Sequence, residues 1–212
     1  MRRVALLHGL ASSFDRNWRD YGWVDLLAEA GYEVSPLALP GHGTDLAVAD
    51  QLPAGPLDGV GFSAGAEALL AVAVARPDTF ARLVLMGIGS SVLDADRSVA
   101  LALADALDGP EDPGDIGTRI FRRMAVAAGH ELPPIVAYLR RPRHPPSLAD
   151  LARIRCPVVV VVGDRDPAHP ADRLVAALPD ARAVTLRGID HFATPSDPRA
   201  MDAVLDFLAG EG

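Results

Sequence analysis

A serine in a glycine-rich pentapeptide is the residue whose surroundings best fit chemistry. Ser63 lies in Gly61-Phe62-Ser63-Ala64-Gly65, a G-x-S-x-G pattern. The pattern predicts a nucleophile when a strand precedes it and a helix follows, because the sharp turn exposes the hydroxyl and requires small neighbours. We expect a strand at 58–62 and a helix at 64–75, which supply that context. The alternative is a serine that only caps the helix.

A serine hydroxyl is a weak nucleophile and needs a neighbouring base. Of the six histidines, His191 follows the final expected strand, where the base belongs in the chain order Ser…Asp…His. His8 and His42 are better suited to shaping loops or facing a substrate. The remaining three, His130, His144 and His169, are expected to be solvated surface residues.

The acid that orients the histidine should follow an intermediate strand. The apolar run at 158–162 ends in Gly163-Asp164-Arg165-Asp166-Pro167, which offers two candidates. Asp164 is closer to the strand end, whereas Asp166 precedes a proline turn that would let its side chain face the histidine loop. The acid would hold the imidazole in the right tautomer and stabilise its cation. Either aspartate could instead be a solvated turn residue.

Backbone amides must stabilise the oxyanion that forms on attack. The first expected strand, 4–7, ends in His8-Gly9-Leu10, and the loop here would supply the Leu10 amide as one donor. The Ala64 amide, at the start of the helix after Ser63, would be the other. Four side chains near these segments are candidates for substrate binding: His8, His42, Phe62 and Phe192.

Short apolar runs alternate with helical segments along the chain. Five consecutive valines at 158–162 indicate a strand buried on both faces, as in a parallel sheet covered by helices. The alternation predicts a doubly wound, mostly parallel α/β sheet of about six strands with helices on both faces. The other strands are expected at 4–7, 32–39, 58–62, 83–88 and 183–186, and the helices at 24–30, 64–75, 171–178 and 198–209.

The stretch 91–155 interrupts this alternation and has no strand-like run. It contains helical segments at 98–107, 116–128 and 134–139, so we expect a helical cap over a pocket. The core domain would then comprise 1–90 and 156–212. Basic residues of the cap could bind a carboxylate or phosphate, or form a solvated face, as charge runs usually do; they are Arg119, Arg122, Arg123, Arg140, Arg141, Arg143 and His144.

Composition excludes several classes of partner. The 212 residues fit one domain, and 20 Lys and Arg against 28 Asp and Glu give a net charge of -8. That charge disfavours nucleic acid and anionic membranes as partners, and no apolar segment is long enough to cross a bilayer. The single cysteine, Cys156, cannot form an intramolecular disulfide, and no zinc-type spacing occurs. We therefore expect a cytoplasmic protein without metal or cofactor.

The chain resembles the α/β-hydrolase superfamily over nearly all of its length. Five segments match in order: Leu7-His8-Gly9, Leu39-Pro40-Gly41-His42-Gly43, Gly61-Phe62-Ser63-Ala64-Gly65, Gly163-Asp164-Arg165-Asp166 with Pro170, and Gly188 through His191-Phe192. The resemblance implies Asp166 rather than Asp164 as the acid, and 91–155 as the cap insertion.

The chain also departs from the family pattern. It begins at the strand leading into His8-Gly9, so the N-terminal strands of the family are missing, and 44–57 is too short for a full helix. Phe62 stands where histidine is commoner, and Ala66 where glycine is commoner. A reduced core with an exposed sheet edge would allow a homodimer.

These observations favour hydrolysis of an ester, thioester or lactone of a small, partly apolar molecule through an acyl-enzyme. Carbon–carbon bond hydrolysis, a lyase reaction and cofactor-independent oxygenation are alternatives on the same fold. A protein that binds a small ligand without turnover is a further alternative, although the chain keeps Ser63, Asp166 and His191 together.

Overall fold

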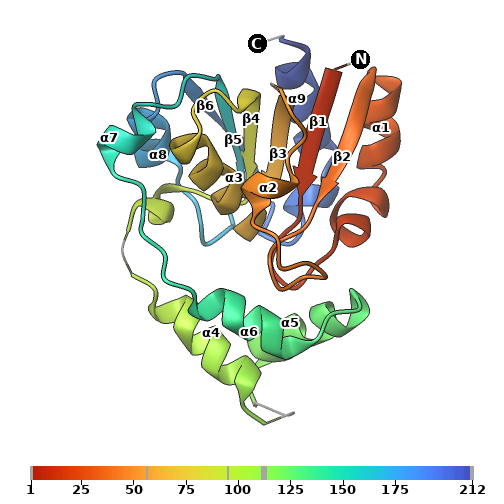
Figure 1. The fold of residues 1–212 in the computed structure, drawn as a ribbon, viewed down its shortest axis with the longest axis vertical. Helices are drawn as coiled ribbons and strands as arrows, with labels where there is room; N and C mark the ends of the chain where they lie inside the picture. The colour runs from red at the N-terminus through yellow and green to blue at the C-terminus, as the bar shows by residue number, and fades with distance from the viewer. Residues whose placement is uncertain (1, 56, 95, 111–113, 211–212) are drawn as a thin grey trace.

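Six strands form one sheet in the order β2-β1-β3-β4-β5-β6, and each neighbouring pair is parallel (Figure 1). The structure, a computed structural model, describes residues 2–55, 57–94, 96–110 and 114–210. The strands are β1 (Arg2–Leu7), β2 (Tyr32–Leu37), β3 (Leu57–Phe62), β4 (Phe80–Met86), β5 (Val158–Gly163) and β6 (Ala181–Leu186). The predicted parallel α/β sheet is therefore confirmed.

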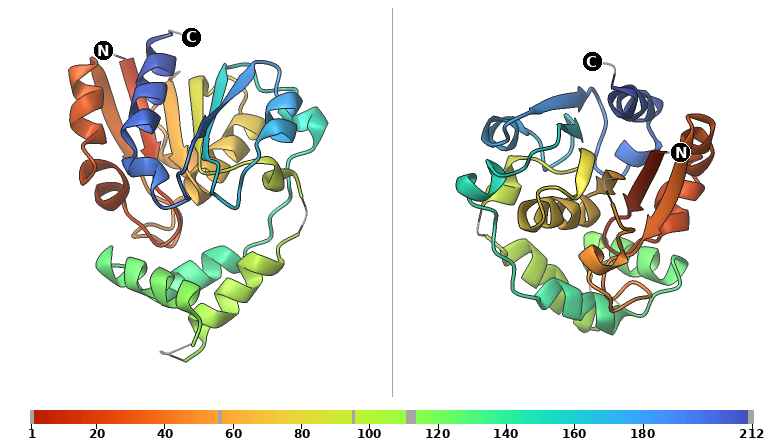
Figure 2. Two further views of the ribbon diagram at one scale, coloured as in Figure 1. Left: turned by 180° about the vertical axis from the view of Figure 1, so that it is seen from behind. Right: turned by 45° about the horizontal axis from the view of Figure 1, so that its top comes forward.

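The two faces of the sheet have separate apolar cores. Side chains alternate along a strand, so Val158, Val160 and Val162 enter one core while Val159 and Val161 enter the other. Helices α3 (Ala64–Ala75) and α8 (Asp172–Ala177) pack on the first face, and α1 (Trp23–Glu29) and α9 (Pro198–Ala209) on the second (Figure 2). Burial on both faces explains why β5 has no polar alternation.

One strand is displaced from its expected position. β4 begins at Phe80 and ends at Met86, whereas apolar content predicted 83–88. The Phe80 ring fills the space above Gly59 of β3, where an added Cβ would come within 2.8 Å of it, and this packing brings Phe80 into the pairing. At the other end the chain turns at Gly87, whose φ of +65° ends the extended backbone.

The insertion forms a helical layer beyond the carboxyl ends of the strands (Figure 1). Its helices α4 (Ser98–Asp108), α5 (Ile116–Ala127) and α6 (Leu132–Arg140) are here called the cap. They lie where the sequence predicted three helical segments. The short helices α2 (Val48–Gln51) and α7 (Leu148–Leu151) complete the α-helices of the described residues. Positions 1 and 212, the outer ends of the predicted core domain, lie outside those residues.

Both tryptophans belong to the core beneath α1. Trp18, in the short helical turn η1 (Asp15–Arg19), and Trp23 are fully buried and meet edge to face with ring centroids 5.5 Å apart. Core packing is thus the role of each. No helix in the described ranges is long and apolar enough to span a bilayer.

Candidate active site

The turn between β3 and α3 holds Ser63 in a strained backbone conformation. Its φ of 53° and ψ of -122° are unusual for a residue with a side chain. A Cβ on Gly61 would lie 2.7 Å from the backbone nitrogen of Ala66, and one on Gly65 would collide with the carbonyl oxygen of Leu7. The small residues around the serine are therefore required by the close approach of β1, β3 and α3.

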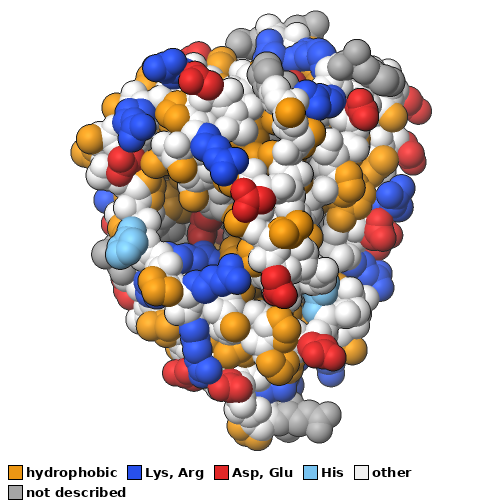
Figure 3. Space-filling model, in the orientation of Figure 1, with side chains coloured by type: hydrophobic (Ala, Val, Ile, Leu, Met, Phe, Trp, Pro, Cys, Tyr) orange, Lys and Arg blue, Asp and Glu red, His pale blue; other side chains and the backbone are white. Residues whose placement is uncertain are grey.

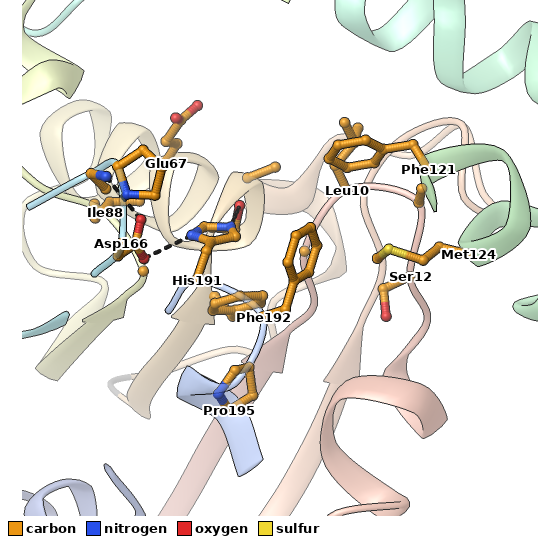
Figure 4. A pocket seen from close by; sticks show the side chains of 18 of the residues that line it. Leu10, Ser12, Glu67, Ile88, Phe121, Met124, Asp166, His191, Phe192 and Pro195 are labelled. Atoms are coloured by element: carbon orange, nitrogen blue, oxygen red, sulfur yellow. Dashed lines mark hydrogen bonds and ion pairs between the residues drawn. The ribbon is translucent and has the colours of Figure 1, made fainter. Parts of the chain in front are cut away.

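His191 and Asp166 form a hydrogen-bonded line with this serine. Figure 4 shows the contact between Asp166 and His191. The Nε2 atom of His191 lies 3.0 Å from Ser63 Oγ, and its Nδ1 atom lies 2.8 Å from Asp166 Oδ2. A carboxylate only accepts, so the imidazole proton belongs on Nδ1, and Nε2 is left to accept from the hydroxyl. The Asp166 side chain is 1% exposed, and its other oxygen accepts from the Ala168 amide at 2.8 Å.

The structure separates the two candidate acids. Asp164 is exposed and accepts a 2.7 Å hydrogen bond from the amide of Gly188, so it links the turn after β5 to the turn that leads to His191. Asp166 alone of the two contacts the imidazole. Asp164 therefore links the turn after β5 to the loop that contains His191, and Asp166 is the candidate acid that lies against the imidazole.

Two backbone amides belong to the segments that meet at Ser63. Leu10 follows β1 and Ala64 begins α3, and both residues line the cleft beside Ser63. A Cβ on Gly9 would lie 3.5 Å from the Ser63 Cβ, which shows how closely the loop after β1 approaches the serine. Within the described part of the chain, neither amide has a recorded protein acceptor. Both can donate to an oxyanion at this place.

A cleft of about 1220 Å³ lies between the carboxyl ends of the strands and the cap. The surface is hollowed there, with basic side chains along the cap side (Figure 3). Its walls are largely apolar, and Figure 4 shows Leu10, Phe121, Met124 and Phe192 around the space beside His191. The Phe121 and Phe192 rings lie 6.3 Å apart, and Phe62 also lines the cleft with its ring 5.0 Å from that of His191.

The cap's arginines have different surroundings. Arg143 lines the cleft, pairs with Glu67 of α3 at 2.8 Å and lies over the Tyr138 ring. Desolvation raises the pKa of the Glu67 carboxyl, and Arg143 opposes that rise. Arg140 forms exposed ion pairs, whereas Arg122 donates to backbone carbonyls at the end of α4. The solvated-face interpretation thus fits Arg140 and is wrong for Arg122 and Arg143.

His8 and His42 lie behind the loop after β1, outside the lining of the cleft. Desolvation lowers the pKa of His8 to about 3 and that of His42 to about 4, so both are neutral at ordinary pH. The structure thus places them as loop-shaping residues rather than against a substrate. The surface expectation for His130 is wrong, because its Nε2 lies 2.8 Å from the Ser12 carbonyl oxygen.

The described residues contain no cluster of three side chains that could hold a metal ion. Cys156 is buried, and desolvation raises the pKa of its thiol to about 11, which leaves it protonated and unreactive at neutral pH.

The sequence matches the alpha/beta hydrolase family over residues 4–204. The chain therefore belongs to the α/β-hydrolase family, and its class of activity is that of a hydrolase.

Known proteins of this fold resemble the whole chain. A human protein named "Putative protein-lysine deacylase ABHD14B" is 26% identical over 210 residues, covering 98% of this chain and 83% of its own length. The structure of MenH from S. aureus superposes with a TM-score of 0.75 at 18% identity, covering 99% of this chain and 94% of that one. Carboxylesterase CesB from Bacillus subtilis gives a TM-score of 0.73 at 16% identity, covering 100% of this chain and 85% of that one.

Proposed function

We propose that this protein is a serine hydrolase that cleaves an ester, thioester or lactone of a small, partly apolar molecule. The observation that carries the proposal is the hydrogen-bonded line from Ser63 Oγ through His191 to the buried Asp166 carboxylate. This line lies beside two amides without protein acceptors, at the base of a largely apolar cleft. Nucleophile, base, orienting acid and oxyanion donors are then all supplied by the chain itself.

The reaction would proceed through an acyl-enzyme. His191 takes the hydroxyl proton as Ser63 Oγ attacks the carbonyl carbon, and the oxyanion receives hydrogen bonds from the Leu10 and Ala64 amides. The intermediate collapses, and His191 gives its proton to the leaving alcohol or thiol. Water then attacks the acyl-enzyme with His191 again as base. Asp166 stabilises the imidazolium in each half-reaction.

The walls of the cleft favour an uncharged, apolar acyl or alkyl group. The cap contributes Leu103, Phe121, Met124 and Leu139 to the lining. Arg143 faces the same space, but Glu67 already neutralises its charge. An acyl chain that contacts these side chains would leave water, which stabilises binding by about 0.8 kcal/mol for each buried CH₂ group.

The test is reaction of the purified protein with a fluorophosphonate probe, mapped by mass spectrometry, beside p-nitrophenyl esters of increasing acyl length. We expect phosphonylation at Ser63 with loss of fluoride, and ester turnover that Ser63→Ala lowers by about 10³-fold or more. A folded protein that neither labels nor turns over any ester would refute the proposal. Labelling without ester turnover would direct the search to the carbon–carbon bond hydrolases.

Removal of an acyl group from lysine is a second candidate. The human relative that matches 98% of this chain carries that name. Exposed carboxylates line the cleft at Asp20, Asp94 and Asp96. Asp20 pairs with Arg16 and Asp94 with Arg173, so Asp96 is the carboxylate of this set with which a cationic peptide would pair. The same serine and histidine would serve, because the leaving amine needs a proton that His191 can give. Acyl-lysine peptides assayed by mass spectrometry would distinguish the two substrates.

A further inference from the structure

Three histidines form a group behind residues 9–12, here called the oxyanion loop because they include Leu10. His8 and His42 are buried, and His130 is half-buried. The His42 ring lies 5.4 Å from that of His8, 5.2 Å from that of His130 and 5.7 Å from that of Tyr138. His8 and His42 come from the core, whereas His130 and Tyr138 belong to the insertion that contains the cap. The group therefore joins the two parts of the molecule directly behind the oxyanion loop.

His42 holds the middle of the oxyanion loop through its ring. Its Nε2 atom accepts from the Ala11 amide at 2.9 Å, and its Nδ1 atom lies 3.2 Å from the Pro40 carbonyl oxygen. An Nε2 that accepts carries no proton, so the proton lies on Nδ1 and is donated to Pro40. Ala11 has a φ of 57°, which is costly for alanine and persists only where its surroundings hold it.

His130 holds the end of the same loop from the side of the cap. Its Nε2 atom is 2.8 Å from the Ser12 carbonyl oxygen and must donate, because a carbonyl only accepts. The start of the loop is held as well, since the Gly9 amide donates to Asn17 Oδ1 at 3.0 Å. Leu10, whose own amide has no recorded acceptor among the described residues, therefore lies between positions that are fixed on both sides.

We propose that His42 and His130 are positioning residues that keep the Leu10 amide aimed at the oxyanion, with His130 making that aim depend on the position of the cap. The inference rests on the proposed function, because it gives a purpose to the Leu10 amide only if an oxyanion forms beside Ser63. Neither imidazole needs to touch the substrate.

The protonation state of His42 agrees with this role. Burial, together with the nearby His130, lowers the pKa of His42 to about 4. The ring therefore stays neutral near pH 7 and keeps Nε2 free to accept. A second ring proton would place a donor against the Ala11 amide and break the contact.

The test compares acceptor-keeping and acceptor-removing variants of His42. Glutamine can place its amide oxygen near the position of Nε2, whereas leucine fills similar space without an acceptor. We expect His42→Leu to lower kcat for a p-nitrophenyl ester by about 10- to 100-fold with KM changed less than about twofold, since losing one oxyanion donor costs about 10²–10³-fold. His42→Gln should recover most of the loss. His144→Gln, at an exposed histidine, is the matched control and should match the wild type.

His130 is tested in the same way. His130→Gln keeps a donor for the Ser12 carbonyl oxygen and His130→Leu removes it, so only the leucine variant should lower kcat. Suppose that the wild type is active and that the leucine variants keep full kcat or lose activity only through KM. That result would overturn the positioning role and leave the proposed function intact. Glutamine variants as impaired as the leucine variants would also overturn it.

A measurement without substrate separates the two proposals. Long-range ¹⁵N–¹H spectra of the histidine rings at pH 7 should show His42 protonated at Nδ1 and bare at Nε2. A proton on Nε2 would overturn the inference whether or not any ester is hydrolysed. Absent labelling of wild-type Ser63 would instead contradict the proposed function. If His42→Leu does not fold, the spectra and the His130 variants still decide the question.

Discussion

The turn that carries Ser63 and the cap that faces it are held in place by different kinds of contact. Around the turn, backbone meets backbone: Gly61 and Gly65 leave no room for a Cβ, and the Ser63 amide donates to the Met86 carbonyl oxygen at 2.8 Å. These contacts join β1, β3, β4 and α3. A change of one methyl group there must displace main chain.

The insertion that contains the cap meets the core through side chains as well as backbone, and buried apolar residues of its helices share one cluster with the core. Arg143 pairs with Glu67, His130 bonds to Ser12, and the backbone of Pro134 approaches Gly41. Several large apolar side chains of its helices are exposed, including Val99, Ile116 and Val126. The backbone geometry around Ser63 is thus fixed by the core, whereas the insertion supplies apolar side chains of the cleft wall and reaches the oxyanion loop through His130.

Replacement of the candidate acid, Asp166, should give the largest effect and tests the contacts made by the core. Asp166→Asn should lower kcat by about 10²–10⁴-fold, because asparagine can stabilise the wrong tautomer of His191 and not its cation. Asp164→Asn should change kcat little, since an amide oxygen can still accept from the Gly188 backbone. Ester hydrolysis by the two purified variants checks this, and equal losses would mean that the histidine loop responds as a unit.

A methyl group at Gly65 tests how rigid the turn is. Alanine favours helix by about 1 kcal/mol over glycine, so without a clash Gly65→Ala would stabilise the protein. The collision with the Leu7 carbonyl oxygen predicts the opposite, a fall of about 3 kcal/mol in the free energy of unfolding. Urea unfolding decides by the sign of the change. A more stable variant would show that β1 and α3 can separate at little cost.

A cap residue should change substrate preference and leave the chemistry intact. Phe121→Ala removes a ring from the cleft wall, and we expect kcat/KM for the longest esters to fall about tenfold while acetyl ester turnover is unchanged. Ile120→Ala changes the neighbouring residue of α5, which lies outside the cleft lining, and is the matched control. Equal losses on short and long esters would contradict the assigned role of the cap.

Acid should affect the two regions in opposite directions. Burial raises the pKa of Asp58 in β3, so its contribution to stability grows as the pH falls and is lost as the pH rises through that pKa. Hydrogen bonds to Thr118 lower the pKa of Asp115, which caps α5, so its contribution is present at neutral pH and lost as the pH falls through the lowered value. Between pH 6 and 3, hydrogen exchange corrected for intrinsic rates should therefore increase in α5 before β3.

Asp115→Asn supplies the control for that experiment. Asparagine is also a good N-cap and does not titrate, so protection of α5 in this variant should lose its dependence on pH in that range. Protection that still falls with pH would assign the acid sensitivity of α5 to another group.

Sequence alone predicted the parallel sheet and singled out Ser63 and His191, because both depend on local patterns. His8 and His42, which were also candidates for substrate binding, lie outside the cleft. In a parallel sheet the loops after the strands share one edge, so Ser63, Asp166 and His191 meet once each is assigned to such a loop. The five consecutive valines at 158–162 have no polar alternation, so the sequence itself indicates a strand buried on both faces. Resemblance to a family added the choice between the two aspartates, which the residues themselves left open.

What sequence did not predict depends on contacts between distant segments. His130 has an unremarkable local context, and its partner Ser12 lies 118 positions away. Arg143 likewise resembles any other arginine of its run until Glu67 is placed opposite it. The start of β4 depended on the packing of Phe80 against Gly59, which only the folded sheet brings together. Each of these follows from packing rather than from periodicity.

The buried indole of Trp23 offers an optical view of the site. Its Nε1–H donates at 2.7 Å to the carbonyl oxygen of Pro195, a residue that lines the cleft just beyond Phe192. A bound ligand that displaces the segment from His191 to Pro195 would alter this hydrogen bond and thus the wavelength of indole emission. Trp18 lies 5.5 Å from Trp23 and emits in the same band, so Trp18→Phe is the variant in which the emission of Trp23 is measured alone. The chain thus carries its own fluorescent reporter of ligand binding, with no label to attach.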